Sequence, residues 1–264
     1  MTTTTTHSLS DSATMLRRDL KHLVRYPSVT VMLIAMPVVF LLLFVYVLGG
    51  TLGNGLDAGA GGRADYLAYV VPGILVVAIA AVAQGTAIFV AMDMTEGIIA
   101  RFRTMAISRA AVLAGHVGGS MIQTALGIGA VVAVALAMGY RASASEVQWL
   151  GAFAVLGMIA LALTWLTVAL GMAAKSVESA SNTPMFLVIL PLLSSGFAPT
   201  DSMPPAVQWF ADHQPFTPFI ETVRGLLNGS PDTSSLIATT AWCAAIAVGS
   251  YWWARASYER RSTR

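Results

Sequence analysis

The fold is decided first by residues 29–48, VTVMLIAMPVVFLLLFVYVL, a run of 20 residues without a charged side chain. A helix rises about 1.5 Å per residue, so this run reaches about 30 Å, the thickness of the hydrocarbon core of a bilayer. Backbone polar groups find no water partners in lipid, and a continuous helix satisfies them internally. The run therefore predicts a membrane-spanning helix. It is about twice as long as the apolar region of a secretory signal, so we expect it to be retained as a span.

Five further apolar stretches follow, and the whole chain is 56% hydrophobic and only 11% charged. A soluble domain carries about a quarter charged residues, so this composition indicates a protein embedded in the lipid bilayer. We expect an all-α, polytopic membrane protein, a single domain over residues 1–264 with six transmembrane helices. The six stretches are 29–48, 67–92, 111–138, 149–173, 179–197 and 236–253.

The positive charges sort to one side of these stretches. Twelve of the 15 Lys and Arg residues fall in segments that alternate to the same side, whereas Arg63, Arg141 and Arg224 fall on the other. Cationic segments stay in the cytoplasm during insertion, so both termini are predicted to be cytoplasmic, in a bacterial plasma (inner) membrane. The twelve are Arg17, Arg18, Lys21, Arg25, Arg101, Arg103, Arg109, Lys175, Arg255, Arg260, Arg261 and Arg264.

Two parts of the chain outside the spans have helical patterns of their own. Residues 12–25, within a cytoplasmic tip at 1–28, alternate apolar and basic positions and predict an amphipathic helix in the headgroup plane. The outer segment 198–235 carries two short amphipathic stretches, 206–213 and 219–228, set off by prolines and a glycine. These stretches predict two short outer helices that do not span.

The sequence lacks the residues of an ATP-hydrolysing site. A P-loop lysine follows glycine, but Lys21 follows Leu20 and Lys175 follows Ala174. We therefore expect that this chain is not an enzyme by itself and binds no cofactor. Four scattered histidines and a single cysteine, Cys243, predict no metal site, and the dispersed basic charge predicts no nucleic-acid partner.

The segment at 93–110 is the most polar stretch on the cytoplasmic side. Ile98, Phe102 and Met105 share one helical stripe, and Arg101 lies near Asp93 and Glu96 in the sequence. An apolar stripe beside arginines suits docking onto another protein. An ordinary solvated positive loop is the other interpretation, and the segment alone leaves both open.

Two other classes of function compete for this sequence. Asp93, Glu96, Gly97, Ala100 and Arg101 resemble the opening of the metal-binding motif of CDP-alcohol phosphotransferases. The motif's later glycine position holds Ala110 here, and its two later aspartate positions hold Ala114 and Gly118. A membrane-embedded transferase of that type would lack half of its metal ligands. A secondary transporter would bury ionisable residues in mid-span, and the six predicted span interiors contain no Asp, Glu, Lys or Arg.

Two motifs in their order within a six-span chain resemble the membrane subunits of type-2 ABC exporters, in particular the daunorubicin-resistance permease family. The first is Glu96-Gly97 followed by FRTMAISR, with Ala106 where that family commonly has proline. The second is SGFAPTDSMPPAVQWFADHQPFTPFIETVRGLLNG at 195–229, with Gln214 where the family often has asparagine. The resemblance covers about 250 residues, most of the chain.

The resemblance implies a permease subunit of an ATP-driven exporter for an amphiphilic substrate such as a drug, an antibiotic or a lipid-like molecule. It implies a separate ABC ATPase subunit that binds ATP and Mg²⁺, and a second permease copy, in a homodimer or a heterodimer. The cytoplasmic segment would then be the loop that couples to the ATPase. Its predicted contact residues are Glu96, Gly97, Arg101, Phe102, Arg103, Met105, Ser108 and Arg109.

Substrate contacts are expected from the first, second and fifth stretches, although aromatic and Met stripes also serve simple helix packing. The candidates are Phe40, Phe44, Gln84, Thr86, Phe89, Met185, Phe186 and Ser194. For an outer gate the candidates are Trp209, Phe216, Glu221 and Arg224. Glu221 and Arg224 are three residues apart and can pair on one helical face, and an ordinary structural pair is the alternative interpretation.

Overall fold

A computed structural model describes residues 27–53, 62–95 and 109–261, and every regular element within these ranges is helical. The predicted amphipathic helix at 12–25 lies outside the described residues. Most of the predicted coupling segment does so too.

Five helices are long and apolar enough to cross a membrane. They agree with five of the six predicted stretches and confirm the all-helical class. The first is α2 (Pro27–Leu43), which continues through a π-helical turn, η1 (Phe44–Leu48), into α3 (Gly49–Gly53). The other four are α4 (Arg63–Thr95), α6 (Arg109–Ala137), α7 (Glu146–Ala173) and α12 (Thr233–Arg261).

The stretch at 179–197 is not one helix, contrary to the prediction. It is divided among α8 (Val177–Asn182), η2 (Thr183–Met185), α9 (Phe186–Ile189) and η3 (Leu190–Leu193). Pro184 and Pro191 explain the division, since each lacks an N–H donor and its ring displaces the preceding turn. The structure has 3₁₀ turns at both prolines.

The helix ends also differ from the predicted boundaries. Helix α3 carries the first helical run on through Gly49–Gly53, beyond the predicted end of the first stretch at residue 48. Helix α4 continues to Thr95, so Asp93 belongs to its last turn and not to the loop after it. Helix α7 begins at Glu146 because Ser145 and Gln148 form a capping box.

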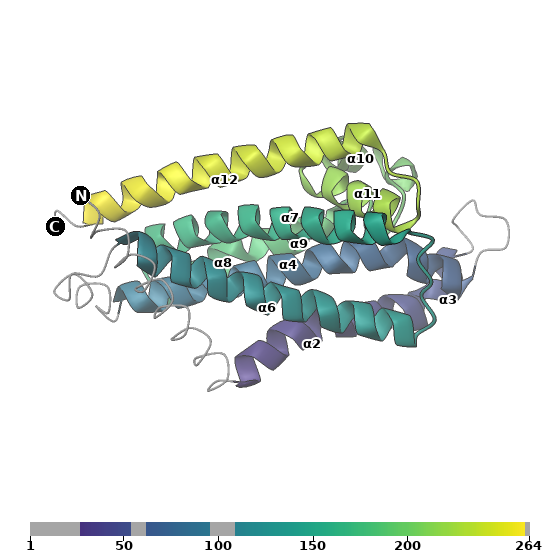
Figure 1. The fold of residues 1–264 in the computed structure, drawn as a ribbon, viewed down its shortest axis with the longest axis horizontal. Coiled ribbons are helices and arrows are strands. Elements are labelled where there is room, and N and C mark those ends of the chain that lie inside the picture. Colours follow the sequence, from purple (N-terminus) through teal and green to yellow (C-terminus); the bar gives the residue numbers. More distant parts are fainter. Residues whose placement is uncertain (1–26, 54–61, 96–108, 262–264) are drawn as a thin grey trace.

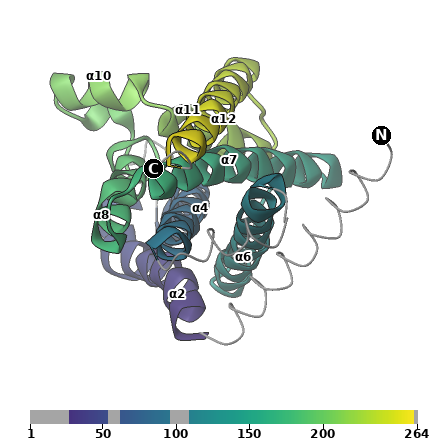
Figure 2. The same cartoon turned by 90° about the vertical axis from the view of Figure 1, so that its left-hand side faces the viewer.

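Helix α4 is the centre of the bundle. Figures 1 and 2 show α7 between α12 on one side and α4 and α6 on the other, with α2 at the opposite edge from α12. In the most apolar 18 residues of each span, 83% of the α4 residues are buried, against 17% in the first helical run (Val31–Thr51) and 17% in α12. The outward faces of these two edge helices are rich in large apolar side chains, including Met32, Val47, Ile237 and Trp252, as a lipid environment requires.

The proline-divided segment 177–193, called here the broken segment, lies antiparallel to α4. Near its start, Gln84 of α4 donates a hydrogen bond to the Ser181 carbonyl at 3.0 Å. Beyond its end, a Cβ added to Gly73 of α4 would stand 2.8 Å from the carbonyl oxygen of Gly196. Between α9 and α12 the chain forms η4 (Thr200–Ser202), α10 (Pro205–His213) and α11 (Phe216–Leu227), which confirms the two short predicted helices.

Candidate functional site

The two ends of the bundle carry different polar groups. At one end, called here the α11 end, α10 and α11 lie beside the start of α4 (Figure 1). At the other, called here the loop end, α4 finishes at Thr95 and α6 begins at Arg109. The gate candidates lie at the α11 end, and the coupling segment joins the helices at the loop end.

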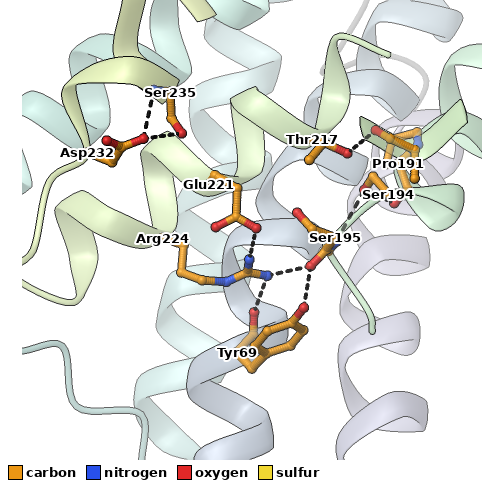
Figure 3. A network of polar contacts seen from close by, with 11 residues as sticks. Tyr69, Pro191, Ser194, Ser195, Thr217, Glu221, Arg224, Asp232 and Ser235 are labelled. Atoms are coloured by element: carbon orange, nitrogen blue, oxygen red, sulfur yellow. Dashed lines mark hydrogen bonds and ion pairs between the residues drawn. The ribbon is translucent and has the colours of Figure 1, made fainter. Parts of the chain in front are cut away.

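Arg224 of α11 is the hub of the α11 end, and only 9% of it is exposed. Its Nη1 donates to Glu221 Oε1 at 2.6 Å, and its Nη2 donates to the backbone carbonyls of Tyr69 at 3.1 Å and Ser195 at 2.7 Å. Figure 3 shows these contacts converging on one guanidinium group. The same group lies 4.0 Å from the centre of the Tyr69 ring, a cation–π geometry. One side chain therefore joins α11, α4 and the turn at 194–197.

The turn at 194–197 is held to α4 by a second set of contacts. The Tyr69 hydroxyl donates to the Ser195 carbonyl at 2.7 Å, and the Tyr66 hydroxyl donates to the Phe197 carbonyl at 3.1 Å. Gly73 of α4 has no side chain, and this lets the backbone of Gly196 approach closely. These contacts hold the turn at 194–197 against α4 independently of Arg224.

The connection between α10 and α11 is also tied down. The Gln214 side chain donates to the carbonyls of Leu190 and Leu193, both at 3.0 Å. Leu190 and Leu193 are the first and last residues of η3. The Gln214 amide therefore connects the two short helices to the proline-broken segment.

The four gate candidates do not share one environment. Glu221 and Arg224 pair as predicted, but Arg224 is buried against backbone and is not a free surface partner. Phe216 is 1% exposed and packs edge-on against Phe219. Trp209 is 64% exposed and stacks on His213. The gate role itself stays a prediction for all four.

The eight pathway candidates fall on several faces of the bundle. Phe44 packs on Phe197, with ring centres 4.6 Å apart, and Phe40 packs on the main core. Thr86 donates to Ser120 of α6, and Ser194 donates to the Pro191 carbonyl within its own turn. Met185 and Phe186 are exposed on the broken segment, and Phe89 is half-buried on α4. The structure does not bring these side chains together, and their contact with substrate stays a prediction.

The loop end contains a polar interior that the sequence did not indicate. Ser120 of α6 accepts a hydrogen bond from Thr86 of α4 at 2.9 Å and lies 3.1 Å from the hydroxyl of Thr164 on α7. Nearer the loop, His116 Nε2 of α6 lies 3.2 Å from Asp93 Oδ2 of α4. His116, Ser120 and Gln123 recur at helical spacing, a signal visible in the sequence only once the buried face of α6 is known.

The coupling residues 96, 97, 101, 102, 103, 105 and 108 lie outside the described residues. Arg109 is the first residue of α6. The described parts of the chain hold no group of three or more His, Cys, Asp or Glu side chains arranged for a metal ion.

A helical bundle with membrane-length spans and apolar outer faces defines a multi-pass membrane protein. The chain matches the ABC-2 type transporter family over residues 12–228 and belongs to that family. It is therefore a membrane subunit of an ABC transporter. This confirms the family expected from the motifs at 96–109 and 195–229.

Two kinds of curated relative agree with this family. Over 225 residues the chain is 28% identical to the daunorubicin resistance ABC transporter permease protein DrrB1 of Streptomyces coeruleorubidus, covering 84% of this chain and 77% of the relative. It is 29% identical over 225 residues to the probable doxorubicin resistance ABC transporter permease protein DrrC of Mycobacterium tuberculosis, covering 80% of this chain and 76% of the relative.

Proposed function

We propose that this chain is the permease subunit of an exporter that moves an amphiphilic, drug-like molecule out of the cell. The family match over residues 12–228, together with relatives named for daunorubicin and doxorubicin resistance, carries this proposal. Neither the transferase nor the secondary transporter has comparable support. The apolar faces on the bundle surface suit a substrate that partitions into lipid before it is moved.

In this proposal the energy comes from a separate ABC ATPase, which binds ATP and Mg²⁺. The segment 96–108 joins α4 to α6 and carries Arg101, Arg103 and the stripe of Phe102 and Met105. It would dock on the ATPase from the cytoplasm, with Arg109 at its edge. A second copy of the permease, identical or related, would complete the transport path between two bundles.

The proposed topology has six crossings and both termini in the cytoplasm. The broken segment 177–193 supplies the crossing that the five long helices lack, because it follows α4 from Gln84 to the turn beside Tyr66. Irregular backbone at membrane depth is tolerated where protein covers it. The excess of Lys and Arg on one side of the spans sets the orientation.

Reconstitution tests the proposal. The chain is purified mildly together with a separate ABC ATPase subunit, placed in liposomes and assayed for ATP-dependent, vanadate-sensitive doxorubicin movement. We expect movement and hydrolysis only when both chains are present. Hydrolysis by the permease alone, or transport without any ATPase chain, would exclude the proposal.

The docking role of the arginines has its own test. Replacing Arg101, Arg103 and Arg109 by alanine should lower vanadate-sensitive transport about tenfold, within the range that coupling between sites contributes. Membrane insertion should continue, since nine other Lys and Arg residues remain on the predicted cytoplasmic side. Normal transport by the triple variant would show that these arginines do not mediate docking.

A further inference from the structure

The Asp93–His116 contact lies directly at the base of the segment that joins α4 to α6. Asp93 belongs to the last turn of α4, which ends at Thr95, and His116 belongs to the second turn of α6, which starts at Arg109. The two side chains are 3.2 Å apart at Nε2 and Oδ2. We infer that Asp93 and His116 are positioning residues for coupling: their contact makes α4 and α6 carry a displacement of segment 96–108 as one body.

Burial gives this contact its strength. Asp93 is 7% exposed and His116 is 8% exposed. A small apolar cluster surrounds this end of the bundle, with members on α4, α6, α7 and α12: Val90, Val117, Val168, Ala169, Met172 and Ala254. A polar contact in such a low-dielectric setting is stronger than in water.

A second tie lies further into the bundle on the same faces. Thr86 precedes Asp93 by two helical turns, and Ser120 follows His116 by one, so the Thr86–Ser120 hydrogen bond joins the same two helices. The contact of Ser120 with Thr164 extends this tie to α7. The Asp93–His116 and Thr86–Ser120 contacts therefore join α4 and α6 at two levels along the helix axes, and two such contacts resist rotation of one helix against the other.

Helix α4 is also fixed against α7 near this level. A Cβ added to Gly171 of α7 would stand 2.6 Å from the Ala87 carbonyl oxygen and 3.0 Å from Cβ of Val90. Such close backbone contact leaves α4 little freedom to slide on α7. Asp93 and His116 attach the start of α6 to this pair of helices.

This inference rests on the proposed function, because it concerns the path from an ATPase to the spans. Polar and ionisable groups buried inside a membrane protein are costly, and such groups mark functional positions. Asp93 and His116 lie near the ends of α4 and α6 that segment 96–108 joins, so a displacement of that segment acts first on the part of the spans that contains them. Without the contact, that displacement would bend α4 and α6 separately, and less of it would reach the rest of the bundle.

Spin-label distances test the inference. Thr95→Cys and Ala114→Cys are introduced together in a Cys243→Ala background; residues 95 and 114 are exposed, one on each helix. The labelled full chain is measured in lipid nanodiscs, alone and in complex with its ATPase, without nucleotide and after vanadate trapping. In the otherwise unmodified chain we expect one narrow distance that trapping leaves unchanged.

In Asp93→Leu and His116→Leu the distance should broaden in the chain alone and shift on trapping by about 2 Å, the size of helix displacements at moving interfaces. The exchange Asp93→His with His116→Asp should restore the narrow distance, which a merely space-filling role would not predict. As matched control, Thr222→Val removes a buried 2.9 Å contact to Thr239 at the α11 end and should leave the distance unchanged.

Leu variants with the same narrow, unshifted distance as the control would overturn the inference. So would a shift on trapping in the chain that keeps both residues. Should a Leu variant fail to fold, Asp93→Asn and His116→Gln, which weaken the contact at similar volume, take its place with the same outcomes. Failure of any ATPase to bind would defeat the proposed function instead, and the measurement on the chain alone would still decide whether the contact holds the helices together.

Discussion

Arg224 has partners on three segments that are far apart in the sequence. Its guanidinium donates to Glu221, to the Tyr69 carbonyl and to the Ser195 carbonyl, and it lies over the Tyr69 ring. Two of the acceptors are backbone oxygens, so their position does not depend on side-chain identity. The sequence predicted the pair with Glu221 from its spacing, but it could not predict acceptors 29 and 155 residues away.

Removal of Arg224 should destabilise the whole α11 end. We expect Arg224→Ala to lower the free energy of unfolding by about 3 kcal/mol, the usual cost of breaking a buried, charge-assisted set of contacts. Arg224→Lys should recover only part, because an ammonium group cannot form the planar fork. Thermal unfolding in detergent measures both, and an alanine variant as stable as the parent would contradict the role of Arg224.

Gly73 offers a sharper test of packing at the same end. A Cβ there would stand 2.8 Å from the Gly196 carbonyl oxygen, so Gly73→Ala should cost about 2 kcal/mol, as overpacking of a tight site does. Gly157 of α7 has nothing within 4 Å of the same position, and Gly157→Ala should be neutral or slightly stabilising. Equal melting temperatures for the two variants would show that the close approach is not needed.

At the scale of the elements, the sequence was most informative for long helices and least informative for the broken one. Residues 29–48 lack charge and lead to one continuous helical run, because nothing but a helix satisfies backbone groups in lipid. A proline inside an apolar stretch disturbs the helix, but the local pattern does not show whether Pro184 and Pro191 bend it or divide it. The structure divides it at both prolines, and Gln84 of α4 and Gln214 donate hydrogen bonds to carbonyls of the divided segment.

The short helices α10 and α11 were predictable for a different reason. Prolines before each helix and Gly229 after the second mark their limits, and Gly229 adopts a φ of 76° that favours glycine. Their attachment to the bundle was not predictable, since it depends on Arg224 and Gln214 reaching distant carbonyls. In the same way, Asp93 was assigned to a loop because its contact with His116 comes from α6, a helix that begins 16 residues after it.

The start of α12 depends on Asp232. Its carboxylate accepts hydrogen bonds from the backbone N–H groups and hydroxyls of Ser234 and Ser235, and these donors hold its pKa well below the ordinary value of 3.8. A lowered pKa in the folded state stabilises the protein above pH 3.8 and is lost as the pH falls below it.

Asp232→Ala should therefore lower the melting temperature at neutral pH, whereas Asp232→Asn, which retains a cap oxygen, should lower it less. The difference between the parent and the alanine variant should shrink on acidification below pH 3.8. Calorimetry or nanoscale fluorimetry across this range measures both effects. A difference that is constant with pH would show that the charge of this cap does not contribute.

At the scale of the whole molecule, the two ends of the bundle are held together by different kinds of contact. The α11 end is held by contacts to backbone carbonyls, through Arg224, Tyr69 and Gln214. The loop end is held by side-chain contacts between α4 and α6. A displacement of the segment that joins these two helices would act directly on those contacts. This division suits a permease that receives force at the cytoplasmic side and changes its helix packing in response.

The central claim is that segment 96–108 faces the cytoplasm, where a separate ATPase can bind it. In a Cys243→Ala background, Phe102→Cys and Ser202→Cys are each made alone and treated with a membrane-impermeant maleimide on intact cells. Ser202 lies in η4 at the α11 end and is exposed. We predict that Ser202→Cys is labelled in intact cells and that Phe102→Cys is labelled only after permeabilisation. Labelling of Phe102→Cys from outside intact cells would contradict the account.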